Sequence, residues 1–130
     1  MMRFVIGALL FALPAGVAAA PTSYSLDEGQ KAHFMNRFLL FHEVCKVSPS
    51  YLGEVNSGFQ GFLATHAENG TPLSVRYARD KPFLLIDAAS DRNITKICAS
   101  LKTASGRAQA LEFGKKMLSD LRSLHAQASH

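Results

Sequence analysis

The sequence predicts an α+β fold of order ααβββα, in which two N-terminal helices precede a three-stranded antiparallel meander and a C-terminal helix. Apolar residues recur at helical spacing over residues 34–45 and again after Thr103, and between these segments the spacing changes to two, as in a strand. The chain has 130 residues, of which 48% are hydrophobic and 18% are charged. This length and composition are typical of one globular domain.

Residues 1–19 have the pattern of a secretory signal peptide. Arg3 precedes an apolar run that ends at Val17, and three alanines follow. The run is too short to cross about 30 Å of hydrocarbon as a helix, and Pro14 interrupts it. We therefore expect cleavage before Ala20 and a single domain over residues 20–130 that has no membrane span and is periplasmic or secreted.

The first long helix is predicted to begin at Ser25 and to end near Val47. Ser25 and Glu28 have the spacing of a capping box, in which each side chain caps a backbone N–H of the first turn. The face toward the core is expected to consist of Phe34, Met35, Phe38, Leu39, Phe41, His42 and Cys45. This helix should be the centre of the core.

A second helix is predicted over residues 50–67, because Pro49 suits the first turn of a helix and apolar residues keep helical spacing after it. Three glycines weaken it, namely Gly53, Gly58 and Gly61. They either let another element approach closely or form a loop wall for a ligand. The Asn-Gly-Thr-Pro run at 69–72 should end this helix in a turn.

After this turn the sequence predicts strands at 73–78, 83–86 and 94–101, separated by polar turns at 79–82 and 90–93. Leu73, Val75 and Tyr77 alternate with small or polar residues, and the second segment is a short apolar run that suits a strand buried on both faces. Helical spacing then returns over 103–127, which predicts the final amphipathic helix.

Cys45 and Cys98 are the two cysteines of the chain. In an exported protein such a pair is most simply a disulfide, which here would join the first helix to the third strand. The alternative is a redox or nucleophilic cysteine, since His42 lies one helical turn before Cys45 and could lower its pKa. No Cys-x-x-Cys pair occurs, and an exported thiol with one available partner is prone to oxidation.

The layout resembles that of small exported proteobacterial proteins of unknown function: a helix that ends in Cys, a second helix, a Gly-initiated meander with Cys in its last strand, and an amphipathic C-terminal helix. The resemblance is carried by residues 41–45, 70–79 and 83–87, by Cys98 and by the helix after Thr103. It implies a structural disulfide between Cys45 and Cys98 and supplies no activity.

The formal net charge is +4 at pH 7, and Arg76, Arg79 and Lys81 gather around the first predicted hairpin turn. These three residues could form a basic patch for an acidic partner or an anionic envelope surface, or they could simply keep a strand edge solvated. Because nucleic acid is scarce outside the cytoplasm, we expect no nucleic-acid partner.

No segment contains a catalytic or nucleotide-binding motif, and no pair of histidines has the spacing of metal ligands. His33, His42, His66 and Asp87 could be assembled into a metal or acid–base site, but His33 and His42 should lie on roughly opposite faces of one helix. We therefore expect neither metal nor cofactor.

The predicted function is that of an exported, non-catalytic binding or accessory protein whose partner is another envelope protein. The alternatives are a periplasmic stress chaperone and a small secreted hydrolase that uses His42 or His66.

Overall fold

The computed structural model describes residues 22–23 and 26–128, with side chains over 27–124. The predicted signal peptide and its cleavage site lie outside the described residues. The helices are α2 (Leu26–Cys45), the 3-10 helix η1 (Pro49–Leu52), α3 (Glu54–Thr65), α4 (Leu73–Ala89), α5 (Ile94–Leu101) and α6 (Ala104–Ala128). Three very short strands, β1 (Thr22–Ser23), β2 (His66–Glu68) and β3 (Thr71–Pro72), form a small sheet of order β1-β2-β3.

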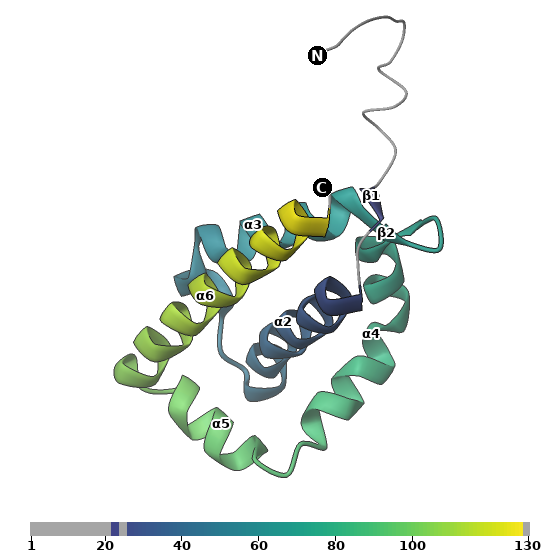
Figure 1. Ribbon diagram of the computed structural model, residues 1–130. Coiled ribbons are helices and arrows are strands. Elements are labelled where there is room, and N and C mark those ends of the chain that lie inside the picture. The colour runs from purple at the N-terminus through teal and green to yellow at the C-terminus, as the bar shows by residue number, and fades with distance from the viewer. Residues whose placement is uncertain (1–21, 24–25, 129–130) are drawn as a thin grey trace, which may run out of the picture.

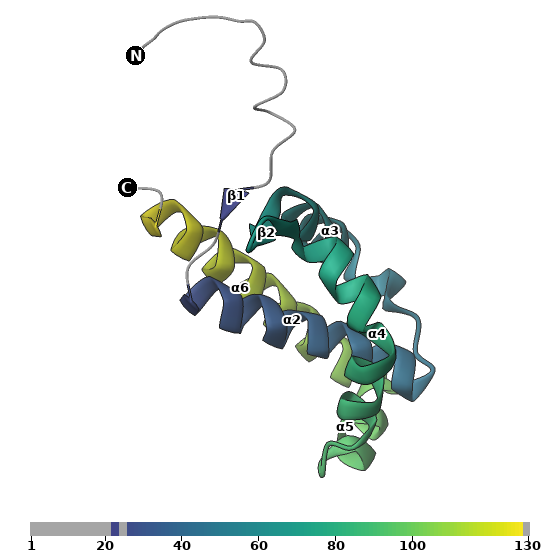
Figure 2. The ribbon, with the colours of Figure 1, turned by 90° about the vertical axis from the view of Figure 1, so that its right-hand side faces the viewer.

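Helix α2 lies in the middle of the molecule, with α6 on one side, α4 on the other and α5 across one end (Figure 1). Figure 2 shows α3 packed along the far side of this group, beside α6 and α4. The predicted central role of the first helix agrees with this arrangement. Its buried face differs from the prediction in part, because Phe34 is 55% exposed and Leu40 is buried in its place.

The predicted α+β fold of order ααβββα is wrong, because α4 and α5 occupy the segment that was expected to form the meander. The alternation of Leu73, Val75 and Tyr77 was misleading. In a helix, Leu73 and Tyr77 lie one turn apart and both face the core, whereas Val75 points outward and is 54% exposed. The run that was expected to be buried on both faces likewise presents Phe83 and Ile86 to solvent.

Pro82 lies inside α4, where the sequence predicted a turn at 79–82. Proline has no N–H, so the helix loses the bond that would reach back to the carbonyl of Ala78. Both Pro82 and Ala78 are exposed, so this side of the helix faces water, which can hydrate the carbonyl. The helix continues through the proline and curves around α2 (Figure 1).

The second predicted helix is divided into η1 and α3 at Gly53, whose φ of 52° lies in a region that glycine tolerates best. After α3, Asn69 and Gly70 both have positive φ and join β2 to β3 in a two-residue hairpin. On its other edge β2 pairs in parallel with β1. The small sheet thus attaches the start of the described chain to the end of α3.

The core combines side chains from all the long helices. Its buried members are Ala32, Met35 and Phe38 of α2; Leu52 of η1; Val55, Phe59, Phe62 and Leu63 of α3; Leu73 of α4; and Leu118 and Leu121 of α6. One contiguous cluster of this kind is what a single small domain requires. The cluster brings side chains of α3 together with side chains of α2, α4 and α6.

Gly106, near the start of α6, allows the close approach of α5. A Cβ atom built on Gly106 would lie 1.8 Å from the carbonyl oxygen of Ser100, which is backbone and cannot move aside. We expect Gly106→Ala to lower the free energy of unfolding by about 1 to 3 kcal/mol, the usual result of overpacking. Urea denaturation monitored by circular dichroism would measure this change.

Gly61→Ala is the matched control, because a Cβ atom at this position in α3 would have no neighbour within 4 Å. Alanine has the higher helix propensity, so this variant should gain up to about 1 kcal/mol. Equal effects of the two substitutions would show that the contact between Gly106 and Ser100 is not what decides the result.

Candidate functional site

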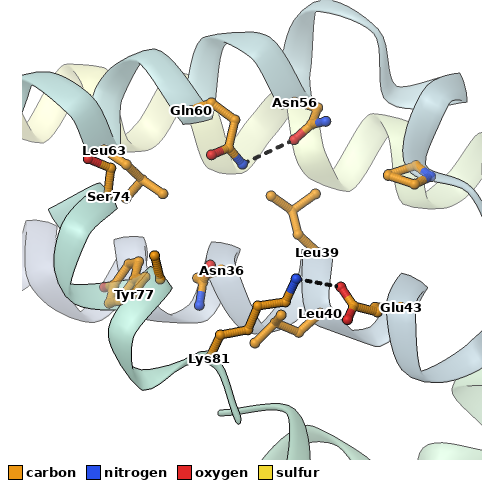
Figure 3. Close-up of a pocket in the computed structure, with 12 residues that line it drawn as sticks. Asn36, Leu39, Leu40, Glu43, Asn56, Gln60, Leu63, Ser74, Tyr77 and Lys81 are labelled. Atoms are coloured by element: carbon orange, nitrogen blue, oxygen red, sulfur yellow. Dashed lines mark hydrogen bonds and ion pairs between the residues drawn. The ribbon is translucent and has the colours of Figure 1, made fainter. Parts of the chain in front are cut away.

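A groove of about 300 Å³ opens between α2, α3 and α4 (Figure 3). It is lined by Asn36, Leu39, Leu40, Glu43, Pro49, Asn56, Gln60, Leu63, Ser74, Tyr77, Ala78 and Lys81. Helix α2 packs mainly against α4, α5 and α6. Helix α3 lies farther from this part of α2, which leaves the space between them that forms the groove. Its volume is at the lower end of the range of about 300 to 1,000 Å³ that is usual for ligand sites.

The groove combines an apolar floor with hydrogen-bonding walls. Leu39 and Gln60 point toward each other from α2 and α3 across the opening (Figure 3). The Gln60 amide donates to the Asn56 side-chain oxygen at 3.4 Å, and Asn36 adds a third carboxamide from α2. Each carboxamide offers both donors and an acceptor. The lining therefore suits a neutral ligand that itself carries both donors and acceptors.

Sequence reasoning missed these carboxamides. Asn36 is not among the residues of the expected core face of the first helix, and Asn56 and Gln60 were not singled out. Their spacing of four residues places Asn56 and Gln60 on one face of a helix, and this spacing was the available signal. This spacing alone could not identify a site, because the groove also requires that α4 lie opposite these residues of α3.

The charged residues of the groove neutralise each other. Lys81 of α4 reaches Glu43 of α2 at 3.0 Å and forms one end of the opening (Figure 3).

The other two residues of the predicted basic patch also lie beside carboxylates. Arg76 pairs with Glu68 and, at 3.8 Å, with Asp80. Arg79 is 3.2 Å from Asp80. The three basic residues that the sequence grouped around a hairpin turn thus lie along α4, each beside a carboxylate.

Cys45 and Cys98 form a disulfide, with the two sulfur atoms 2.06 Å apart. The predicted pairing agrees with this contact, but Cys98 lies in α5 and not in a strand. The bond therefore joins the end of α2 to the middle of α5. Because both cysteines are used, neither is available as a free thiol for redox or nucleophilic chemistry.

His42 is a structural residue that links α2 to η1. The Phe38 carbonyl can only accept a hydrogen bond, so Nδ1 carries the proton and donates to it at 3.0 Å. Nε2 then accepts from the Tyr51 hydroxyl at 2.6 Å. The side chain is 1% exposed and its ring meets that of Phe38 edge to face. Both nitrogens are engaged, which leaves neither to activate water.

Burial lowers the pKa of His42 below its ordinary value of 6.5. Below about pH 6.5 the His42 side chain is therefore protonated in the unfolded chain more readily than in the folded protein. The free energy of unfolding should fall as the pH is lowered from about 7.5 to about 5. In His42→Gln this loss should be smaller. Urea midpoints of both proteins at the two pH values would measure it, and parallel losses in both would exclude His42 as the source.

The other members of the hypothetical metal or acid–base site lie apart from His42. His66 Nδ1 donates to the Phe62 carbonyl at 2.8 Å, and its ring stacks on Phe62. His33 is exposed and approaches Tyr77. Asp87 pairs with Arg37, which also binds Asp91 at 2.9 Å and so ties the end of α4 to α2. Within the described range no group of His, Cys, Asp or Glu side chains could hold a metal ion.

Comparison with protein-family models, with curated proteins and with solved structures finds no match to this chain. None of the described helices is both long enough and apolar enough to cross a membrane. The disulfide is compatible with an extracellular location.

Proposed function

We propose that this protein is an exported binding protein that holds a short peptide segment of another envelope protein in the groove between α2, α3 and α4. The single observation that supports this most is the set of three carboxamides, Asn36, Asn56 and Gln60, above an apolar floor. A peptide backbone carries one donor and one acceptor at each residue, which is the pattern that a carboxamide matches. Leu39 and Leu63 would receive one apolar side chain of the ligand.

The charge of the groove favours the same ligand class. Glu43 and Lys81 satisfy each other at 3.0 Å, so the lining offers no unpaired charge to a phosphate or a carboxylate. A volume of about 300 Å³ accommodates one or two residues of a peptide. A neutral internal segment of a partner therefore fits better than a charged chain end or a large cofactor.

The test is selection of peptides from a random library on the mature protein, followed by nuclear magnetic resonance of a selected peptide with labelled protein. The side-chain NH₂ signals of Asn36, Asn56 and Gln60 should shift, whereas those of Asn93 and Gln109, which are outside the groove, should not. Gln60→Leu should weaken binding by about 2-fold to 10-fold, the value of one hydrogen bond.

Gln30→Leu is the matched control, because Gln30 is an exposed carboxamide of α2 outside the groove. It should change the affinity less than twofold. Equal losses in the two variants, or shifts confined to Asn93 and Gln109, would contradict the proposal.

Export itself is part of the proposal and rests on Arg3, the apolar run and the alanines that follow it. N-terminal sequencing of the protein from envelope fractions should begin at Ala20, give or take two residues. An intact Met1 in those fractions would contradict cleavage and indicate a membrane-attached protein.

A stress chaperone is the second candidate, and the observation that favours it is the outer face of α4. Val75, Phe83 and Ile86 are all exposed there, and exposed apolar patches mark interaction surfaces. If this face holds unfolded clients, Phe83→Ser should reduce the ability of the protein to suppress light scattering by a heat-unfolded client. Unchanged suppression would remove this candidate.

A further inference from the structure

A second groove, of about 370 Å³, lies between α2, α5 and α6. It is separate from the groove described above, because the α2 residues that line it, Phe38 and Phe41, lie on the opposite face of the helix from Asn36, Leu40 and Glu43. Its remaining apolar wall consists of Ile97 and Leu101 of α5 and of Gly106, Ala110 and Phe113 of α6.

Partly exposed aromatic rings extend this apolar surface beyond the groove. Phe113 is 38% exposed, and its ring centroid lies 5.2 Å from that of Phe38 and 6.1 Å from that of Phe34. Phe34 itself is largely exposed. A concave apolar surface continued by exposed rings is the form of a site for an apolar ligand.

The wall formed by α5 is held in position from two sides. The disulfide attaches Cys98, next to Ile97, to the end of α2. The close approach of Gly106 to Ser100 fixes the other end of α5 against α6. The groove is therefore largely formed before any ligand arrives, which lowers the loss of conformational freedom on binding.

The rim carries one positive charge. Lys96 lines the groove and is exposed, and among the side chains that the structure describes it takes part in none of the ion pairs. Ser100 and Gln109 are the other polar residues of the lining. A ligand that fills this groove is thus apolar along its length and negative at one end.

We propose that the groove between α2, α5 and α6 binds a fatty acid, with the acyl chain against Phe41, Ile97 and Phe113 and the carboxylate at Lys96. The apolar wall supplies affinity in proportion to the length of the chain it covers. Lys96 supplies the preference for an anionic head. This site is independent of the peptide groove and of the function proposed for it.

Isothermal titration calorimetry with octanoate, decanoate and dodecanoate below their micellar concentrations tests the site. The affinity should rise by up to about fourfold for each added methylene until the groove is filled. Decyltrimethylammonium, whose alkyl chain is one carbon longer than that of decanoate and whose charge is opposite, should nevertheless bind more weakly than decanoate. Absence of saturable decanoate binding with Kd below about 1 mM would overturn the proposal.

Lys96→Glu locates the head group, and Lys102→Glu is its matched control, since Lys102 is an exposed lysine at the end of α5 outside the groove. Lys96→Glu should weaken decanoate binding at least tenfold and reverse the preference between decanoate and decyltrimethylammonium. Lys102→Glu should change the affinity less than twofold. Equal losses in the two variants would overturn the assignment of Lys96.

Methyl signals in nuclear magnetic resonance locate the chain even if a variant folds poorly, because they are recorded on the unaltered protein. Decanoate should shift the methyl signals of Ile97 and Leu101 and leave those of Leu40 and Leu63, in the other groove, in place. Shifts of Leu40 and Leu63 alone would assign the amphiphile to the peptide groove and overturn the proposal.

Discussion

Phe59→Ala should lower the free energy of unfolding by about 3 to 5 kcal/mol, the usual range for removal of a buried phenylalanine. Phe59 is completely buried in α3 and belongs to the cluster that joins α3 to α2, α4 and α6. The loss has two parts, the transfer of the ring from water and the cavity that remains when its neighbours cannot close up. Because the net stability of a small domain is about 5 to 15 kcal/mol, much of it would be lost.

The control is Phe83→Ala in α4, where the ring is 74% exposed. This variant should lie within about 0.5 kcal/mol of the wild type, as is usual for surface positions. Urea denaturation of both variants under the same conditions measures the difference. Similar losses in the two variants would mean that the outer face of α4 is covered in the folded protein.

Replacing both cysteines by alanine should cost about 4 kcal/mol, if the disulfide stabilises the fold by restricting the unfolded chain. Cys45 and Cys98 are 53 residues apart, so the bond closes a long loop that contains α3 and α4. The unfolded oxidised chain has far fewer conformations than the reduced one, which is why the effect should be large. A comparison of the double variant with the wild type by urea denaturation gives the value.

Mass spectrometry after alkylation is the check on the bond itself. The native protein should contain no thiol that reacts, and reduction should release two. Two reactive thiols in the native protein, or a loss below about 1 kcal/mol in the double variant, would contradict a stabilising disulfide of the size that loop closure predicts.

The helices at the two ends of the domain could be predicted from the sequence. The first was expected over 25–47 and spans Leu26–Cys45, and the last was expected over 103–127 and spans Ala104–Ala128. Both have an apolar stripe over several turns, which strands cannot imitate. The cysteine pair was also predictable, since two cysteines allow one intramolecular pairing.

The middle of the chain could not be predicted because its local signals conflict with its packing. Leu73, Tyr77, Leu84 and Ala88 do have helical spacing, but Pro82 and the apolar run around it favoured a turn and a strand. Packing decided the outcome, since Leu73 and Ala88 at the two ends of α4 are fully buried. Both grooves depend on how α3, α4 and α5 lie against α2, so neither could be derived from spacing alone.

The position of the disulfide also determines how oxidation can go wrong. During synthesis Cys45 emerges 53 residues before Cys98, so its thiol has no partner within its own chain until α3, α4 and the first half of α5 have followed. Because the chain has two cysteines, an incorrect disulfide between protein thiols must join separate molecules. The rate of this intermolecular reaction is second order in protein concentration, so dilution suppresses it. The correct bond forms within one molecule, and its rate per molecule does not depend on the protein concentration.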